Sequence, residues 1–335
     1  SVHPMDEMDA WQNLLRRMME VSASDLHAAP HQQIQLRRDG VLMAEDLVPT
    51  ASMMEACACQ MLSDAQRALL SVQDVDAAWN WEGRRFRGNF YRTQEGLALS
   101  LRLLPEHIMT PDEIGMPSAV RTALEMRDGL VLLCGATGAG KTTTLAALID
   151  AVNHTRSLHI ITLEDPVEYV FAADRAFFSQ REEGRDFASF PDAVRSALRE
   201  DPDLLLVGEI RDRATLEATL LAAATGVLVV GTIHAGTTAQ AARRVESFFP
   251  ADARDAVRAQ FADVVRGIFA QRLLPRRGGG RIAVFETLVG TPAVRNVLRQ
   301  GRYDQLETLM MSGAAQGMQT AEMAEDALRA RGVLA

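Results

Sequence analysis

Lysine is nearly absent from this sequence of 335 residues. Of its 35 basic residues, 34 are arginine, and the only lysine is Lys141. An ammonium is a compact, strongly hydrated charge, whereas a guanidinium is a planar fork, so the two are not interchangeable. A lysine kept where every other such position is arginine predicts a specific chemical role for Lys141.

Cysteine is also scarce, since the chain has only Cys57, Cys59 and Cys134. Three cysteines cannot form a disulfide framework, and no pair has the spacing of a metal clamp. This pattern excludes the small disulfide-rich secreted class and favours a reducing compartment.

No apolar run reaches the roughly 18 residues that a membrane-spanning helix needs. The nearest candidate, Leu216–Ile233, contains Glu217 and several threonines and glycines. The acidic N-terminus lacks the basic start and apolar stretch of a secretory signal. We therefore expect no transmembrane segment and a cytoplasmic location.

Positive charge and aromatic side chains are too few for a nucleic-acid channel. The net charge is −9 at pH 7, and aromatic residues make up 5% of the chain. Proteins that bind single strands combine a basic groove with aromatic stacking platforms. The composition therefore argues against nucleic acid as a partner.

The length predicts about two domains. We expect an N-terminal α+β domain over residues 1–104, because helical stretches alternate there with a hairpin-like pattern in RRFRGNFYRTQEGLALSLRLL. Residues 105–118 carry three prolines and little periodicity, which is typical of a linker. Residues 119–335 alternate apolar strands with helices as far as Ile233, which predicts a parallel α/β sheet. After Thr237 the pattern is mostly helical, apart from the strand-like IAVFETL.

A glycine-rich loop lies between the predicted strand GLVLLC and the helix that begins at Lys141. It matches the P-loop pattern GxxxxGK[ST], in which backbone N–H groups and a helix N-terminus surround phosphate oxygens. In this pattern the lysine reaches the β- and γ-phosphates and the following hydroxyl binds Mg²⁺. The predicted ATP-binding residues are Gly135, Ala136, Thr137, Gly138, Ala139, Gly140, Lys141, Thr142 and Thr143.

Polar residues follow three further apolar strands. Glu164 ends one strand, Glu209 follows the next after Gly208, and His234 follows a third. An acid after a strand is ordinarily a solvated turn, but ligands of an open parallel sheet bind at the carboxyl ends of its strands. We therefore expect one carboxylate near Mg²⁺, one that activates water, and a histidine that contacts the γ-phosphate or acts as a switch.

These residues stand in long motifs that resemble one family. LEDPVEY resembles the aspartate box, REDPDLLLVGEIRD the Walker B region and TGVLVVGTIHAGTTA the histidine box of secretion-type hexameric ATPases. RFRGNFYR, EIGMP, GTPAVRNVLRQ and GMQT add a similarity to the PilT-type retraction ATPases of type IV pili. The similarity runs from Ser24 nearly to the C-terminus.

The resemblance implies a PAS-like N-terminal domain joined to a RecA-like P-loop NTPase domain with a helical C-terminal part, assembled as a homohexamer. Glu164 would be the general base, and Glu209 would hold Mg²⁺ through water, together with Thr142. His234 matches the second histidine of the family's box, whereas Val227 stands where the family usually has the first.

Further residues are carried over from the same resemblance. Arg87 and Arg102 match arginines that reach nucleotide phosphates in this family, and Arg85 is a third candidate. Arg295 and Asn296 match the motif tied to retraction, although the stretch also fits an ordinary amphipathic helix with exposed arginines.

The resemblance therefore implies a Mg-ATP-driven motor for pilus retraction and twitching-type motility. Its partner would be an inner-membrane platform protein, and its place the cytosolic face of that membrane. The alternatives are a related type II/IV secretion or conjugation-system ATPase, a nucleic-acid motor, and a scaffold whose shape ATP sets without turnover.

Overall fold

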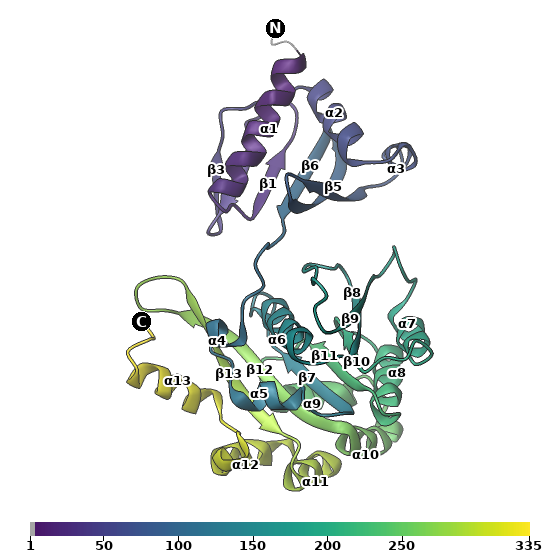
Figure 1. The fold of residues 1–335 in the computed structure, drawn as a ribbon, viewed down its shortest axis with the longest axis vertical. Coiled ribbons are helices and arrows are strands. Elements are labelled where there is room, and N and C mark those ends of the chain that lie inside the picture. The colour runs from purple at the N-terminus through teal and green to yellow at the C-terminus, as the bar shows by residue number, and fades with distance from the viewer. Residues whose placement is uncertain (1–3) are drawn as a thin grey trace. The chain divides into compact units, whose positions relative to one another are not determined.

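The computed structural model describes residues 4–335. The chain divides into two compact units, Ser1–His107 and Ile108–Ala335 (Figure 1). The boundary falls inside the expected linker 105–118, but the second part of this segment belongs to the second unit. Ile114 and Met116 are buried in the core of that unit.

The first unit is a six-stranded antiparallel sheet with the strand order β3-β2-β1-β6-β5-β4. Its core forms between the sheet and the helices, because apolar residues recur at every second position on the strands and at every third or fourth position on the helices. On β5, Phe86 and Phe90 are buried on alternate positions, while α1 buries Trp11, Leu15 and Met18. The elements are α1 (Pro4–Glu20), β1 (Asp25–Ala28), β2 (Gln35–Arg38), β3 (Val41–Ala44), α2 (Ala51–Met61), α3 (Asp64–Leu69), β4 (Val75–Trp81), β5 (Arg84–Thr93) and β6 (Gly96–Leu103).

The second unit is built on a seven-stranded sheet with the order β13-β12-β7-β11-β10-β8-β9, in which only the β12–β13 pair is antiparallel. Its strands are β7 (Gly129–Cys134), β8 (His159–Glu164), β9 (Phe177–Glu182), β10 (Leu204–Val207), β11 (Leu228–Ile233), β12 (Val265–Pro275) and β13 (Arg281–Val289). Its α-helices are α4 (Pro111–Ile114), α5 (Ser118–Ala123), α6 (Lys141–Thr155), α7 (Phe190–Ala197), α8 (Arg213–Ala224), α9 (Thr238–Ser247), α10 (Arg254–Val264), α11 (Pro292–Gln300), α12 (Leu306–Ser312) and α13 (Ala321–Ala330). Three 3₁₀ turns, η1 (Ala251–Ala253), η2 (Tyr303–Gln305) and η3 (Ala314–Gln316), complete it.

The central strands are apolar throughout because helices cover both faces of the sheet. Every residue of β7, β10 and β11 is buried. Leu130 and Leu132 of β7 pack in the core formed with α7 to α10, whereas Val131 and Leu133 pack in the core formed with α5 and α6. The predicted parallel α/β sheet is therefore confirmed.

The region after Thr237 contains a strand that the sequence pattern did not indicate. β12 pairs in parallel with β7 and antiparallel with β13. Its run VRGIFAQRLLP mixes arginines with apolar residues and has no period-two alternation, because most of it is buried on both faces. No helix among residues 4–335 is long and apolar enough to span a membrane.

Candidate active site

Four strands of the second unit end at one edge of its sheet. The register pairs Val207 with Leu163 and Gly231, and Ile233 with Cys134. The segments that follow β7, β8, β10 and β11 therefore leave the sheet side by side. This edge brings together the glycine-rich loop, Glu164, Glu209 and His234.

The glycine-rich loop needs its glycines for backbone conformation and for space. Gly138 and Gly140 have φ values of 81° and 86°, a region that residues with a Cβ rarely adopt. A Cβ at Gly135 would lie 2.6 Å from the carbonyl oxygen of Gln271 on β12. Gly140 then leads directly into α6, so the first N–H groups of that helix open toward the loop. Within the predicted ATP-binding set, Ala136, Thr137, Gly138 and Thr142 are exposed and Gly135 and Ala139 are buried.

Lys141 lies in the first turn of α6, where its Nζ donates a hydrogen bond of 2.8 Å to the carbonyl oxygen of Gly135. Burial lowers the pKa of this ammonium, and the negative charge of Glu209 partly opposes that shift. The only lysine and the acid after β10 are thus electrostatic neighbours. Thr143, two residues on, shares a hydrogen bond of 3.2 Å with the hydroxyl of Tyr169.

Glu164 is a largely buried carboxyl at the end of β8. Burial raises its pKa to about 7, while hydrogen bonds from Thr162, at 2.8 Å, and Gln180 act in the opposite direction. The neighbouring charges of Glu168 and Glu182 raise it further. A carboxyl whose pKa lies near neutrality can exchange a proton at physiological pH, as a general base requires.

Gly208 and Glu209 follow β10 next to the end of β8. A Cβ at Gly208 would lie 2.8 Å from the carbonyl oxygen of Leu163 and 3.3 Å from Cα of Glu164. Glycine is therefore required where the two acidic strand ends approach each other. Glu209 is half-buried and forms an ion pair of 2.7 Å with Arg211.

Arg211 is a site residue that the sequence did not single out. Its guanidinium pairs with Glu209 and lies 3.8 Å from the carboxylate of Asp165. It therefore connects the segment after β8 with the segment after β10. Only its place inside the motif VGEIRD could have pointed to it.

His234 is exposed at the start of the loop between β11 and α9. Two side chains hold this loop: Gln240 accepts from the N–H of Gly236 at 2.9 Å, and Glu286 accepts from the N–H of Thr238 at 2.9 Å. Val227, at the other end of β11, is a buried core residue. Val227 and His234, the two residues matched to histidines in the sequence analysis, therefore stand at opposite ends of one strand.

The predicted arginines belong to the first unit, whereas Lys141 belongs to the second. Arg87 on β5 is paired directly with Arg102 on β6, and Arg102 is paired with Asp25 on β1. Asp25 accepts a hydrogen bond of 3.0 Å from Arg102, which offsets the repulsion between two adjacent cations. Arg85 lies two residues before Arg87, on the same face of β5.

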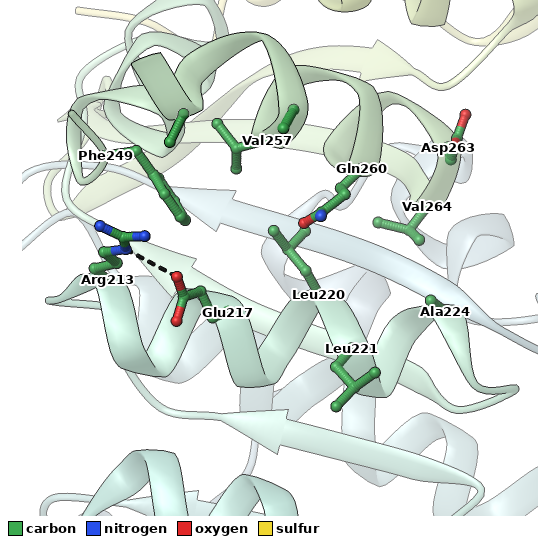
Figure 2. Close-up of a pocket in the computed structure, with 12 residues that line it drawn as sticks. Arg213, Glu217, Leu220, Leu221, Ala224, Phe249, Val257, Gln260, Asp263 and Val264 are labelled. Carbon is green, nitrogen blue, oxygen red and sulfur yellow. Dashed lines mark hydrogen bonds and ion pairs between the residues drawn. The ribbon is translucent and has the colours of Figure 1, made fainter. Parts of the chain in front are cut away.

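A cavity of about 550 Å³ lies between α8 and α10 of the second unit. Leu220, Phe249, Val257 and Val264 line it, and an ion pair between Arg213 and Glu217 stands at one end (Figure 2). None of the predicted nucleotide or catalytic residues lines it, so the candidate site is the strand edge and not this cavity. Arg295 and Asn296 lie elsewhere, on α11, with Asn296 exposed.

A P-loop on a parallel sheet, with acidic residues at the same edge, defines the P-loop NTPase class of α/β protein. The chain belongs to the family described as "Type II/IV secretion system protein", which matches residues 7–331.

Individual relatives support the same assignment. The chain is 37% identical to the type IV pilus retractation ATPase PilT of Pseudomonas aeruginosa, over 96% of this chain and 94% of the relative. It is 43% identical to the uncharacterized protein YggR of Escherichia coli, over 78% of this chain and 81% of the relative. The crystal structure of the pilus retraction motor PilT with bound ADP matches with a TM-score of 0.89 and 36% identity, covering 96% of this chain and 93% of that one. The resemblance predicted from the motifs is thereby confirmed, as are the ATPase class and the mixed α/β fold.

Proposed function

We propose that this chain is a motor ATPase that hydrolyses Mg-ATP and drives the retraction of type IV pili. One observation carries the proposal: the P-loop, Glu164, Glu209 and His234 all leave the same edge of one sheet. The similarity to retraction ATPases along nearly the whole chain supports pilus retraction as the process that the motor drives.

In this proposal the second unit is a RecA-like domain that holds ATP on the loop from Gly135 to Thr143. Backbone N–H groups of the loop and Lys141 would contact the phosphates. Mg²⁺ is a hard cation that prefers oxygen ligands and keeps several waters. The hydroxyl of the exposed Thr142 would supply one such oxygen ligand. Glu209 would act on the metal through one of its waters. The metal would stabilise the negative charge on the transferring phosphoryl group.

Glu164 would accept a proton from the attacking water. Its raised pKa supports this role, because a carboxylate in water, with a pKa near 4.3, is a much weaker base. His234 would contact the γ-phosphate. When the γ-phosphate is lost, this contact would break and the loop before α9 would change its conformation.

The first unit would be a PAS-like domain that supplies Arg87 and Arg102 to a nucleotide in a ring of six copies. Cationic side chains that reach the transferring phosphoryl group can raise turnover greatly. Rotation of the two units about the start of the expected linker, where the first unit ends at His107, would convert hydrolysis into movement. The motor would act on an inner-membrane platform protein from the cytosolic face of that membrane, with Arg295 and Asn296 on the coupling surface.

The first experiment is Mg-ATP turnover per subunit over a wide range of protein concentration. We expect turnover to rise steeply and then saturate, because the sites are completed between subunits. Flat turnover would limit Arg87 and Arg102 to their own chain. In the Glu164→Gln variant, ATP should still bind but turnover should be lost; normal turnover in this variant would contradict the proposal.

The second candidate is a related type II/IV secretion or conjugation-system ATPase, because the family description names type II/IV secretion systems. It would share the chemistry and differ in the membrane partner. Loss of pilus retraction in cells that carry the Lys141→Ala variant separates the two. Stimulation of turnover by DNA or RNA would instead indicate a nucleic-acid motor, and binding without any turnover a scaffold.

A further inference from the structure

Gln271 of β12 lies against both ends of the glycine-rich loop. It follows Ala270, which is paired with Cys134 at the end of β7. A Cβ at Gly135 would lie 2.6 Å from the Gln271 carbonyl oxygen, and a Cβ at Gly140 would lie 2.9 Å from its Nε2. One residue of the neighbouring strand thus contacts the first and the last glycine of the loop, with its backbone and its side chain respectively.

The polar end of Gln271 is buried without full hydrogen bonding. The residue is 3% exposed, and its Oε1 accepts no hydrogen bond from any described residue of the chain. A buried acceptor without a partner carries a desolvation penalty, and native structures contain few of them. Packing against Gly140 does not by itself require an amide. Both methyl groups of Leu273 lie 3.5 Å from the position that a Cβ of Gly140 would take, so an apolar side chain also fits there.

We propose that Gln271 is a positioning residue for the phosphate-binding loop. In the nucleotide-bound conformation its Oε1 accepts a hydrogen bond from a backbone N–H of the loop. This bond holds the loop in the geometry that surrounds the phosphates. The inference rests on the proposed binding of nucleotide at Gly135–Thr143.

This role predicts opposite effects on stability and on binding. A contact that forms only in the bound state shifts the equilibrium toward that state by its own free energy. Replacing Gln271 with an apolar side chain of similar size removes the unpaired acceptor from the nucleotide-free protein and removes the bond from the bound protein. If Gln271 had a purely structural role, its replacement would lower both the stability of the nucleotide-free protein and the affinity for nucleotide.

The test compares Gln271→Met with the wild type in calorimetric titrations with Mg-ADP and in thermal unfolding without nucleotide. We expect affinity to fall about five- to tenfold, the size of one hydrogen bond, and the unfolding temperature to stay equal or rise. The KM for ATP should rise by the same factor while kcat stays within about twofold. The matched control is Leu273→Met, which touches the same glycine without a polar atom and should leave affinity within about twofold.

Two results would overturn the inference. One is unchanged Mg-ADP affinity in Gln271→Met; the other is a loss of affinity accompanied by a fall in the unfolding temperature of the nucleotide-free protein. Failure of the proposed function looks different: the wild type itself would bind Mg-ADP no better than Lys141→Ala.

Discussion

At the scale of single residues, Glu164 combines two properties that usually exclude each other. It is a carboxyl at the polar edge of the sheet, yet burial dominates its surroundings and raises its pKa to about 7. Glu168 and Glu182 strengthen the shift because like charges oppose ionisation. The result is a group whose protonation changes in the physiological range.

Turnover should therefore depend on pH through Glu164. Below a pH of about 7 the carboxyl is protonated and cannot accept a proton, so turnover should fall about tenfold per pH unit. A pH profile of kcat between pH 5 and 9 measures this. A profile that stays flat down to pH 5 would contradict the assignment of Glu164 as the base.

Stability should show the opposite dependence on pH. Between the unfolded pKa near 4.5 and the folded value of about 7, the folded state binds one proton that the unfolded state has released, so stability falls as pH rises. Glu164→Gln should stabilise the second unit at pH 8 by on the order of 2–3 kcal/mol, and the gain should vanish only near pH 4, below the unfolded pKa. Urea unfolding at both pH values measures the difference; an equal gain at both would indicate another cause.

Gly208 offers a test of the contact between the two acidic strand ends. Gly208→Ala should cost about 1–3 kcal/mol because the new Cβ would meet the backbone of Leu163, which cannot move aside easily. It should also displace Glu209 and reduce turnover. Gly236→Ala is the matched control for stability, because its Cβ would meet only the flexible end of Gln240, at 3.1 Å. Equal losses in both variants would argue against close packing of the strand ends.

At the scale of elements, one partly buried junction ties α9, α10 and η2 together. Glu246 of α9 accepts hydrogen bonds from Arg258 of α10, at 2.5 Å, and from the hydroxyl of Tyr303 in η2, at 2.6 Å. Burial alone would raise the pKa of Glu246, but these two donors outweigh it and lower the pKa below its usual value. The carboxylate is therefore held in its charged form.

Removing one donor at this junction should weaken the packing of all three elements. We expect Tyr303→Phe to lower the free energy of unfolding by about 1–2 kcal/mol, since Glu246 loses a partner in a partly buried place. Glu246→Gln should also destabilise at pH 7, and its cost should disappear as pH falls below the lowered pKa of Glu246. The exposed Glu307→Gln on α12 is the control for surface charge. A cost of Glu246→Gln that persists in acid would contradict the role of the charge.

The elements also differ in how far local sequence determined them. β7, β10 and β11 were predicted because short, wholly apolar runs bounded by turn residues leave few other interpretations. β12 was not predicted, because its arginines and apolar residues follow no strand period. It becomes a strand only through its pairing with β7 and β13.

At the scale of the whole molecule, the proposed ring makes a prediction about mixed assemblies. Arg87→Ala alone should reduce turnover by about a thousandfold, if its guanidinium reaches the phosphates. Mixing Lys141→Ala subunits with Arg87→Ala subunits should restore part of the turnover that neither has, because some sites then combine an intact lysine with a neighbour's intact arginine. Arg92→Ala, which removes a surface pair with Glu55, is the control. No recovery on mixing would restrict Arg87 to its own subunit.

The sequence by itself determined the P-loop, the class of fold and the family. Each depends on residues that are close together in the chain, such as the run from Gly135 to Thr142, or on motifs long enough to be specific. The single lysine pointed to the same place by contrast with 34 arginines.

Tertiary structure alone decided how these motifs become a site. The raised pKa of Glu164 comes from burial and from charges on separate segments, and the contact of Gln271 with the loop comes from the register of β12 beside β7. Arg211 links Asp165, which follows β8, with Glu209, which follows β10, and these two acids are 44 residues apart in the chain. Burial, register and proximity between distant segments are properties of the folded chain, so no local pattern carries them.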